Sequence, residues 1–333
     1  MKLSIVILCW NDLGVIADCL ASIYAGTHCI DFEVIISDNG STDGSLEFIR
    51  SSYPQVHVIE NGRNLRFAKG NNVAIEASRG EYVLILNPDT IIHDGALDSM
   101  IAFADKHPDG GAFGCKVLNS DGSYQGCARP LPTPESEWIA AFWLKALGLL
   151  SDRLHAGLYW RWKGDEERTV GWLAGCFILF RGELLKRLGG FDPQFFYYYE
   201  DTDLCHRVWK AGYTVVYTPI AAITHLGGQS TKKRFPELAF QLDAQITRYR
   251  YFYNYYGERG VRSCRRSALT SLLVRRLGYG VLHAAKPSEA LGRRSGVLRA
   301  LYQWNRKVDP IRLLQNGEEP EVDLKLEGRV MER

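Results

Sequence analysis

Several features that mark other classes of protein are absent from this chain of 333 residues. No stretch reaches the ~18 uninterrupted apolar residues of a membrane-spanning helix, so no spanning segment is predicted. The formal net charge is only +2, which gives no overall attraction to nucleic acid, and none is expected as a partner. Internal repeats and low-complexity tracts are also lacking, which argues against a solenoid or a disordered chain. The composition that remains is that of an ordinary globular protein.

The eight cysteines form no recognisable framework. No two are spaced as CxxC, and the regular spacing of Cys9, Cys19 and Cys29 matches no zinc or disulfide pattern. Because Cys9 and Cys176 lie within apolar runs, these thiols are expected to be buried in a reducing compartment. The apolar run at residues 3–10 is short and lacks a small-residue cleavage site. It therefore predicts a first β-strand, not a signal peptide, and a cytoplasmic location.

Strands and helices alternate through the first third of the chain. Short β-branched runs predict strands, and the segments between them predict helices. The expected strands are 3–9, 32–37, 56–59 and 81–86, and the expected helices are 14–25, one opening at 42–45, and 67–78. Such alternation predicts an α/β fold with a mostly parallel central sheet flanked by helices. Ligands of such sheets bind beyond the carboxyl ends of the strands.

The pattern is looser in the second half. Three prolines between residues 129 and 135 predict an extended connection. The expected elements that follow are a strand-like run at 169–180, a helix at 201–211, a strand at 213–217 and a long aromatic helix at 235–256. The loops after the first four strands are therefore the clearest places for a ligand site.

Polar side chains follow the first three predicted strands. Asn11 comes after the first strand and Asp38 after the second, where a carboxylate can accept hydrogen bonds from a base or ribose. The third loop and the helix start beyond it carry Asn64, Lys69 and Asn71, a setting that favours phosphate. For Asp43, by contrast, a helix N-cap is the favoured interpretation. Together these loops predict a nucleotide site.

The fourth loop, Asn87-Pro88-Asp89-Thr90, adds a candidate metal ligand. Asp89 projects from a turn stiffened by proline, and a hard divalent cation takes oxygen ligands while keeping places for phosphate oxygens. One carboxylate cannot hold the ion alone. His225, between a predicted strand and a Gly-Gly turn, is the best second ligand, provided that it lies near Asp89 in the fold.

Three carboxylates stand together at a helix start in the second half. Glu200, Asp201 and Asp203 follow an aromatic run, and their like charges favour a raised pKa that suits a general base. A structural role, in which the acids interact favourably with the helix dipole, is equally compatible with the spacing. Trp172 and Gly175, in the preceding apolar stretch, are candidates for contact with a second substrate.

Taken in order, these pieces resemble the family 2 inverting glycosyltransferases of GT-A fold, and within them the bacterial rhamnosyltransferase branch. The resemblance extends from Val6 to about Ser230, and its order and spacing carry it, because no single piece is decisive. The matching pieces are residues 6–11, 38–45, 64–72, 86–89, 190–192, 200–204 and 225–228.

The resemblance implies a function and a set of roles. A sugar moves with inversion from a nucleotide donor, dTDP-L-rhamnose first and a UDP-sugar second, to a hydroxyl of a cell-surface glycan or lipid-linked acceptor. Asp201 is the implied catalytic base, with Glu200 and Asp203 beside it. The implied nucleotide-binding residues are Asn11 and Asp38 at the base, and Asn64, Lys69 and Asn71 at the ribose and diphosphate. Asp89 is implied both at the nucleotide and, together with His225, as a ligand of Mg²⁺ or Mn²⁺. Trp172 and Gly175 are implied at the acceptor.

Two residues depart from the family pattern. The Asp-x-Asp motif reads Asn87-Pro88-Asp89 here, so its first carboxylate is missing, and His225 becomes more important for holding a metal. Arg66 stands where many members have glycine, which predicts an additional phosphate contact or a solvent-exposed cation. A catalytically degenerate sugar-nucleotide-binding protein is the alternative. A nucleotidyltransferase is disfavoured because the first strand–helix turn lacks a glycine-rich phosphate loop.

The C-terminal part has a different character. Between Gly257 and Arg312 there are thirteen Lys or Arg against three Asp or Glu. This region and the apolar segment 138–150 predict a peripheral contact with the inner face of the cytoplasmic membrane, and the alternative is a core helix with a solvated basic tail. The expected domains are a GT-A domain at 1–256, with a nucleotide-binding half at 1–118 and an acceptor half at 119–256, and a basic helical extension with an acidic tail at 257–333.

Overall fold

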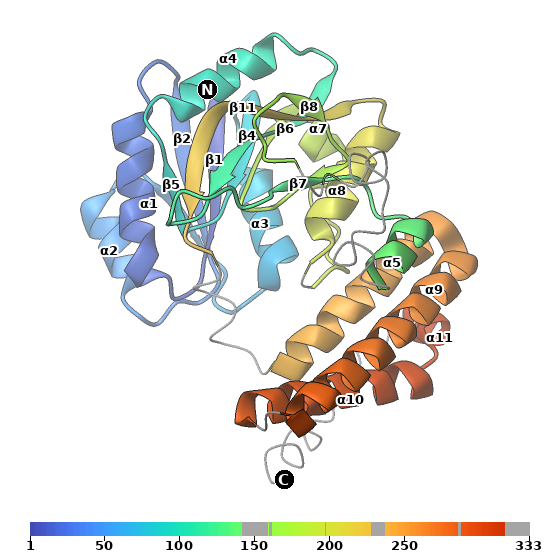
Figure 1. Ribbon diagram of the computed structural model, residues 1–333. Coiled ribbons are helices and arrows are strands. Elements are labelled where there is room, and N and C mark those ends of the chain that lie inside the picture. The colour runs from blue at the N-terminus through green and yellow to red at the C-terminus, as the bar shows by residue number, and fades with distance from the viewer. Residues whose placement is uncertain (142–158, 160–161, 197, 228–236, 286–287, 317–333) are drawn as a thin grey trace. The chain divides into compact units, whose positions relative to one another are not determined.

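The computed structural model describes all residues except 142–158, 160–161, 197, 228–236, 286–287 and 317–333. The chain divides into two compact units. Unit 1 consists of Met1–Leu131, Tyr159–Phe196 and Glu200–Lys233, and unit 2 of Pro132–Leu158, Tyr197–Tyr199 and Arg234–Arg333. Each unit is described by itself below (Figure 1).

Unit 1 is built around a nine-stranded sheet in the order β3-β2-β1-β4-β10-β6-β11-β5, with β8 paired to β11 outside this path. The strands of this sheet are β1 (Leu3–Cys9), β2 (Phe32–Asp38), β3 (His57–Glu60), β4 (Tyr82–Leu86), β5 (Thr90–Ile92), β6 (Gly110–Leu118), β8 (Arg168–Thr169), β10 (Phe177–Arg181) and β11 (Thr214–His225). Strands β1 to β4 pair in parallel, as do β6 and β11, whereas β10, β5 and β8 run antiparallel to their neighbours. A separate two-stranded sheet pairs β7 (Ala128–Arg129) with β9 (Trp172–Leu173).

Helices cover the sheet. The helices of unit 1 are α1 (Leu13–Gly26), α2 (Ser45–Ser52), α3 (Arg66–Ala77), α4 (Ala96–Asp105), α7 (Gly182–Arg187) and α8 (Glu200–Lys210). The crossovers β1-α1-β2 and β2-α2-β3 step in one direction along the sheet, and β3-α3-β4 steps back. Because such crossovers are right-handed, α3 lies on the face opposite α1 and α2.

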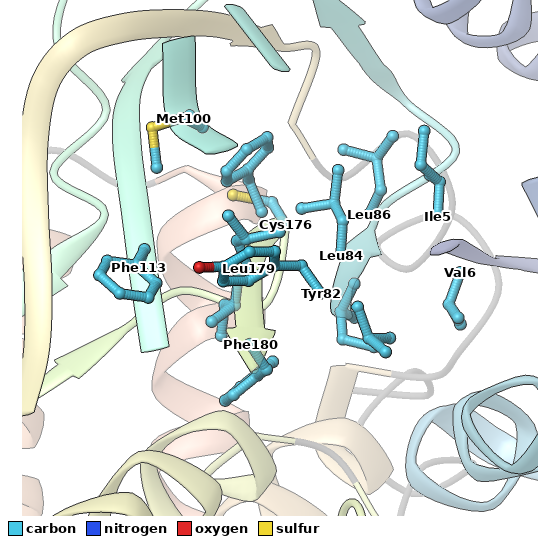
Figure 2. Packing of buried hydrophobic residues seen from close by; sticks show 14 of the residues in the cluster. Ile5, Val6, Tyr82, Leu84, Leu86, Met100, Phe113, Cys176, Leu179 and Phe180 are labelled. Carbon is cyan, nitrogen blue, oxygen red and sulfur yellow. The ribbon is translucent and has the colours of Figure 1, made fainter. Parts of the chain in front are cut away.

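Burial of β-branched and aromatic residues explains why the central strands form where they do. All five side chains of β4 are buried, as expected for a strand covered on both faces. Figure 2 shows Tyr82, Leu84 and Leu86 of β4 beside Leu179 and Phe180 of the antiparallel strand β10. This packed centre fixes the strand ends that carry the polar loops.

Much of the predicted architecture is confirmed, including the α/β class and the mostly parallel central sheet. The single strand expected at 169–180 is wrong, because the structure divides that run among β8, β9 and β10. Gly171 marks one of the breaks. A Cβ built there would lie 2.0 Å from the backbone nitrogen of Leu131, so the chain turns where only glycine fits. The strand expected at 213–217 instead continues to His225.

Unit 2 is helical in its described part. Its helices are α5 (Pro134–Ala141), α9 (Glu237–Ala285), α10 (Glu289–Lys307) and α11 (Pro310–Asn316). Helix α9 is kinked at Gly257, where φ is 60°. One buried cluster of this unit joins Leu238, Leu242 and Leu272 of α9 to Leu301 of α10.

Within the described residues, no helix is long and apolar enough to cross a membrane. Most of the apolar segment expected at 138–150 lies outside the described residues, since α5 covers only its first four positions. The acidic tail also lies outside them.

Candidate active site

The carboxyl ends of several strands meet at one edge of the sheet. Cys9, the last residue of β1, is in register with Asp38, the last residue of β2. Leu86, the last residue of β4, is in register with Ile7 of β1 and pairs with Phe177, the first residue of the antiparallel strand β10. His225 ends β11, which runs parallel to β6 and therefore in the direction of β4. The predicted site loops thus share this edge.

Asp38 and Asn11 lock the first two loops together. Asp38 accepts hydrogen bonds at Oδ2 from the backbone N–H groups of Gly40 and Ser41, both at 2.9 Å, and at Oδ1 from the Ser41 hydroxyl at 2.5 Å. Asn11 accepts from the Thr42 N–H at 2.6 Å, and its own N–H donates to Ser41 Oγ at 2.8 Å. The buried Asp38 carboxylate is therefore directed into its own loop.

Asn39, which the sequence analysis did not single out, joins the second loop to the third. Its Oδ1 accepts from Asn61 Nδ2 at 3.0 Å and from the Leu65 N–H at 3.2 Å, while its Nδ2 donates to Asn64 Oδ1 at 3.2 Å. Asn64 is thus placed at the same edge as Asn11 and Asp38. The available signal for Asn39 was its position directly after a buried strand.

Lys69 and Asn71 are separated by the geometry of α3. Two residues apart on a helix point about 200° away from each other, and Lys69 is exposed whereas Asn71 is buried. Asn71 Nδ2 donates to the Phe67 carbonyl at 2.9 Å, and its Oδ1 has no partner among the described residues. The structure therefore does not bring these two predicted phosphate-side residues together.

Arg66 adopts φ 67°, a backbone conformation that glycine tolerates more easily than arginine. Its guanidinium lies over the ring of Phe196, 4.1 Å from the centroid, in a cation–π contact. The structure thus gives Arg66 a partner that neither sequence-based expectation named. The contact ties the start of α3 to the segment just before α8.

Asp89 and His225, 136 positions apart in the sequence, face each other. Asp89 Oδ1 lies 3.2 Å from His225 Nε2, with exposed side-chain fractions of 4% and 15%. Antiparallel pairing of β5 with β11 brings them together, since His225 is in register with Thr90. The Leu226 N–H also donates to the Asp89 carbonyl at 2.9 Å. The proximity that the metal-ligand interpretation required is therefore present.

Gln125 determines that Nδ1 of the His225 imidazole carries a hydrogen. Its Nε2 donates to Asn119 Oδ1 at 2.9 Å and to the His225 carbonyl at 3.2 Å, so its Oε1 is the atom left to face the ring. That oxygen lies 2.7 Å from His225 Nδ1, which must therefore carry the proton. In the neutral ring, Nε2 then presents its lone pair to Asp89. Gln125 was not singled out from the sequence, where nothing marks it.

A divalent cation fits this arrangement. When the His225 ring is neutral, its Nε2 and the Asp89 oxygen 3.2 Å away are both acceptors, which favours a positive charge between them. The Asn87 amide nitrogen also approaches His225 Nε2, at 3.4 Å, a long contact. No group of three His, Cys, Asp or Glu side chains suited to a metal occurs among the described residues. Asp89 and His225 would hold a metal as a pair and leave its other positions for phosphate oxygens.

Asp201 lies beside this pair through the two residues that precede β10. The Gly175 N–H donates to Asp201 Oδ2 at 3.1 Å, and the carbonyl of the next residue, Cys176, accepts from the Asn87 N–H at 3.1 Å. The predicted base and the predicted metal turn therefore flank two consecutive residues. Trp172, half-buried in β9, lies three residues before Gly175.

The two adjacent carboxyls at the start of α8 have raised pKa values. Burial raises the pKa of Asp201, against hydrogen bonds from Thr202 and Gly175 that favour its charged form. Burial and the nearby charge of Asp201 raise the pKa of Glu200 well above the usual carboxyl range. Glu200 is buried, and its Oε2 has no partner among the described residues. The environments differ, because hydrogen bonds favour the charged form of Asp201, whereas Oε2 of Glu200 has none among the described residues.

Asp203 is engaged differently from its two neighbours. Its Oδ2 accepts from Arg207 Nε at 2.8 Å, one helical turn away. The same guanidinium donates to the carbonyls of Leu188 and Gly190, both at 2.8 Å. Asp203 thus holds an arginine that fastens α8 to the loop before it.

Solved structures of similar fold include glycosyltransferases. The mannosyltransferase PcManGT from Pyrobaculum calidifontis, in complex with GDP-Man and Mn²⁺, matches with a TM-score of 0.55 and 17% identity over 95% of this chain and 83% of that one. S. aureus TarS 1–349 in complex with UDP-GlcNAc matches with a TM-score of 0.52 and 15% identity over 97% and 94%. The fold is therefore the GT-A fold that the resemblance implied.

Family models identify the chain more closely. The model described as Glycosyl transferase family 2 matches residues 4–140, and that described as Glycosyl transferase family group 2 matches residues 82–292. The chain therefore belongs to the family 2 glycosyltransferases.

Its relatives include rhamnosyltransferases. The N-acetylglucosaminyl-diphospho-decaprenol L-rhamnosyltransferase of Mycobacterium tuberculosis is 32% identical over 224 residues, which cover 60% of this chain and 67% of the relative. Rhamnosyltransferase WbbL of Escherichia coli is 27% identical over 215 residues, covering 61% and 76%. The resemblance to the rhamnosyltransferase branch is thus confirmed.

Proposed function

We propose that this glycosyltransferase moves L-rhamnose from dTDP-L-rhamnose to a hydroxyl of a lipid-linked glycan, with inversion and with the help of Mg²⁺ or Mn²⁺. The observation that carries the proposal is the placement of the Asp89–His225 pair and Asp201 at one sheet edge, on either side of residues 175 and 176. The rhamnosyltransferase relatives, one of them named for a diphospho-decaprenol substrate, support the donor and the acceptor. A UDP-sugar is the second candidate donor.

Asp89 and His225 would hold the cation. Bound there, it would offset the negative charge that grows on the departing diphosphate. Mn²⁺ in the complex of the mannosyltransferase of similar fold supports this choice over a proton shared by the pair. Gln125 keeps the Nε2 lone pair of His225 available by accepting from Nδ1.

Asp201 is the proposed base. The sugar–phosphate bond breaks through an oxocarbenium-like state, and the acceptor hydroxyl attacks from the opposite face. The carboxylate of Asp201 takes the proton of that hydroxyl as the new bond forms. Its raised pKa suits this step, because a base works best when its pKa lies nearer the operating pH. The Gly175 and Thr202 donors hold the carboxylate in one orientation.

Glu200 and Asp203 support the base without taking the proton. Buried Glu200 stays neutral while Asp201 titrates, so it does not add a second negative charge beside the acceptor. Asp203 positions α8 through Arg207. The loops around Asn11, Asp38 and Asn64 are proposed to form the floor of the nucleotide site, with Lys69 as an exposed cation available to phosphate. Trp172 is proposed to line the acceptor side.

The two proposed functions of the chain, catalysis and membrane contact, are assigned to successive residue ranges. Residues 1–256 are proposed to form the catalytic domain, and residues 257–333 an extension that contacts the inner face of the cytoplasmic membrane, where a lipid-linked acceptor is found. A catalytically degenerate protein is disfavoured, because the two carboxyls and the imidazole all lie at the expected edge.

A panel of nucleotide sugars tests the proposal. Purified protein is incubated with each donor, a polyprenyl-diphosphate-linked acceptor and Mn²⁺, and nucleoside diphosphate release is measured. Release is expected to be fastest with dTDP-L-rhamnose and to require the acceptor for full rate. Faster release with a UDP-sugar would replace the donor, and no release with any donor would overturn the proposed function.

A further inference from the structure

The outer face of the second half of α9 exposes a row of large apolar side chains. Of the nine large apolar side chains that are exposed in the described part of the chain, five lie within ten residues of this helix. Leu277 is 62% exposed and Val281 is 70% exposed. We call the five residues the apolar stripe: Leu273, Val274, Leu277, Val281 and Leu282. Exposed apolar groups that gather in this way mark an interaction surface.

Helical geometry explains the stripe. Positions 273, 277 and 281 are four residues apart, so their side chains follow one another along one face. The buried Leu272 points away from that face and packs with Leu301 of α10. The stripe is therefore not part of the core of unit 2, and polar residues would serve equally well for folding.

Positive charge surrounds the stripe. Residues 259–288 contain seven Arg or Lys and no Asp or Glu. Arg259, Arg262 and Arg266 are exposed on the turns that precede the stripe, at spacings that place them on the same outward face. Long cationic side chains can lie along an apolar boundary and keep their charge in the polar layer above it. This combination matches an interfacial helix on an anionic surface.

A cavity of about 330 Å³ opens between α9 and α10 beside the stripe. Its charged lining comes from Arg275 of α9 and Arg294 of α10, and Arg294 Nη1 donates to the Tyr279 hydroxyl at 3.3 Å. Leu272, Leu298 and Leu301 supply the apolar wall. Two guanidinium groups above a hydrocarbon wall suit a phosphate ester that carries an apolar chain.

We propose that this face of unit 2 docks on the surface of an anionic phospholipid bilayer. The apolar stripe enters the boundary of the acyl chains, the arginines lie at the phosphate level, and the cavity between Arg275 and Arg294 takes one lipid phosphate. Charge complementarity favours this occupant, because residues 259–288 carry seven Arg or Lys and no Asp or Glu, which an anionic surface attracts, whereas a second copy of the same face would bring like charges together. The proposal gives the membrane contact proposed above a defined surface, and it is independent of the donor sugar.

Vesicle flotation of the full chain tests the proposal. The stripe variant carries Leu273→Ser, Leu277→Ser and Val281→Ser, and the cavity variant carries Arg275→Gln and Arg294→Gln. The matched controls are Ile220→Ser, an apolar side chain of similar exposure (59%) in unit 1, and Arg312→Gln in α11. Melting temperatures confirm that each variant is folded. The vesicles contain phosphatidylcholine alone or phosphatidylcholine with phosphatidylglycerol.

Wild type and both controls are expected to float with the anionic vesicles at moderate salt. The stripe variant should partition at least roughly tenfold less, since it loses buried apolar area. The cavity variant should lose roughly thirtyfold on anionic vesicles only, because each of its two arginines contributes about 1 kcal/mol near such a surface. Equal flotation of wild type and the stripe variant would overturn the proposal. So would a stripe variant that becomes monomeric by light scattering while its flotation is unchanged, since the occupant is then a second copy.

Nucleoside diphosphate release in vesicle-free solution separates this proposal from the catalytic one. Both variants should release nucleoside diphosphate from the donor as wild type does, because the changes lie outside unit 1. Loss of flotation with retained release supports the docking surface. Intact flotation of a wild type that releases nothing would refute the proposed function and leave the docking surface standing.

Discussion

Two parts of the same site differ in whether their polar side chains have hydrogen-bond partners within the protein. After β1 and β2, Asp38 accepts hydrogen bonds within its own loop, Asn11 bonds to the loop after β2, and Asn39 bonds to the loop after β3. At the end of β4 and the start of α8, acceptors face acceptors and carboxyls lie buried with raised pKa values. Unsatisfied polar groups cost stability, so they persist where a ligand completes them. We therefore interpret the first part as a scaffold and the second as the proposed site of the chemistry.

The largest expected effect follows Asp201→Asn. An amide cannot take the acceptor's proton, so kcat should fall by roughly 10³-fold, within the range of a lost general base. The KM for the donor should change little, because the base acts on the acceptor. Steady-state nucleoside diphosphate release measures both constants. Asp165→Asn, an exposed carboxylate in unit 1, is the matched control. A normal kcat in D201N would show that Asp201 is not the catalytic base.

Removal of either member of the metal pair ranks next. His225→Ala and Asp89→Ala should each lower kcat/KM by about 10²-fold, because each leaves a single protein ligand for the cation. The two losses should be similar, since Asn87 supplies no carboxylate to compensate. His57→Ala, an exposed histidine at the start of β3, controls for loss of an imidazole. A harmless H225A would show that the acceptor pair is only a structural contact.

Gln125→Leu tests whether the hydrogen bond from His225 to Gln125 contributes to metal binding. Without the Oε1 acceptor, the His225 ring loses its fixed tautomer, and Mn²⁺ affinity should fall by about tenfold. Titration with Mn²⁺ in the presence of nucleoside diphosphate, followed by electron paramagnetic resonance, measures this affinity without turnover. Gln55→Leu, a surface glutamine before β3, is the control. Unchanged Mn²⁺ binding in Q125L would contradict the positioning role of Gln125.

Glu200→Gln tests the buried acid through the pH dependence of stability. The folded pKa of Glu200 is raised, so the folded state binds more protons than the unfolded state, and stability falls as pH rises from the ordinary carboxyl range toward the folded pKa. Glutamine has no charge to bury. The variant should therefore melt a few degrees above wild type at pH 8, with the difference vanishing below about pH 4. Calorimetry that shows the opposite trend would mean that charged Glu200 is stabilised.

The smallest expected effect on chemistry follows Asp203→Asn. Removing the partner of Arg207 should lower the melting temperature, because a charge in a buried pair is left uncompensated. At a temperature where the variant is folded, kcat should stay within about threefold of wild type, since Asp203 takes no proton. A loss in kcat as large as that of D201N would return Asp203 to the acid–base machinery.

The strand ends could be predicted from sequence because they depend on local patterns. Buried β-branched runs located β1, β2 and β4, and the polar residues just beyond them located Asn11, Asp38 and Asp89. The division of 169–180 could not be predicted, because it depends on the close approach of Gly171 to Leu131, a contact distant in sequence. Apolarity alone does not distinguish one strand from three short ones.

Side-chain contacts between residues distant in sequence also could not be predicted. Gln125 and Asn39 act through side chains that meet their partners only after folding, and Gln125 lies in a stretch that nothing marks. Arg66 could be recognised as unusual from sequence, yet its contact with Phe196 required the structure. Conversely, the pairing of Asp89 with His225 was inferred from the order of motifs, and the structure places the two side chains face to face.

The dependence of turnover on a divalent cation tests the central claim most directly. Nucleoside diphosphate release from dTDP-L-rhamnose is measured with acceptor, in chelator-treated protein, before and after addition of Mn²⁺, for wild type and H225A. Wild type should be almost inactive in chelator and recover fully with Mn²⁺, whereas H225A should recover only in part and at higher Mn²⁺. Equal release with and without cation in wild type would contradict a metal held by Asp89 and His225.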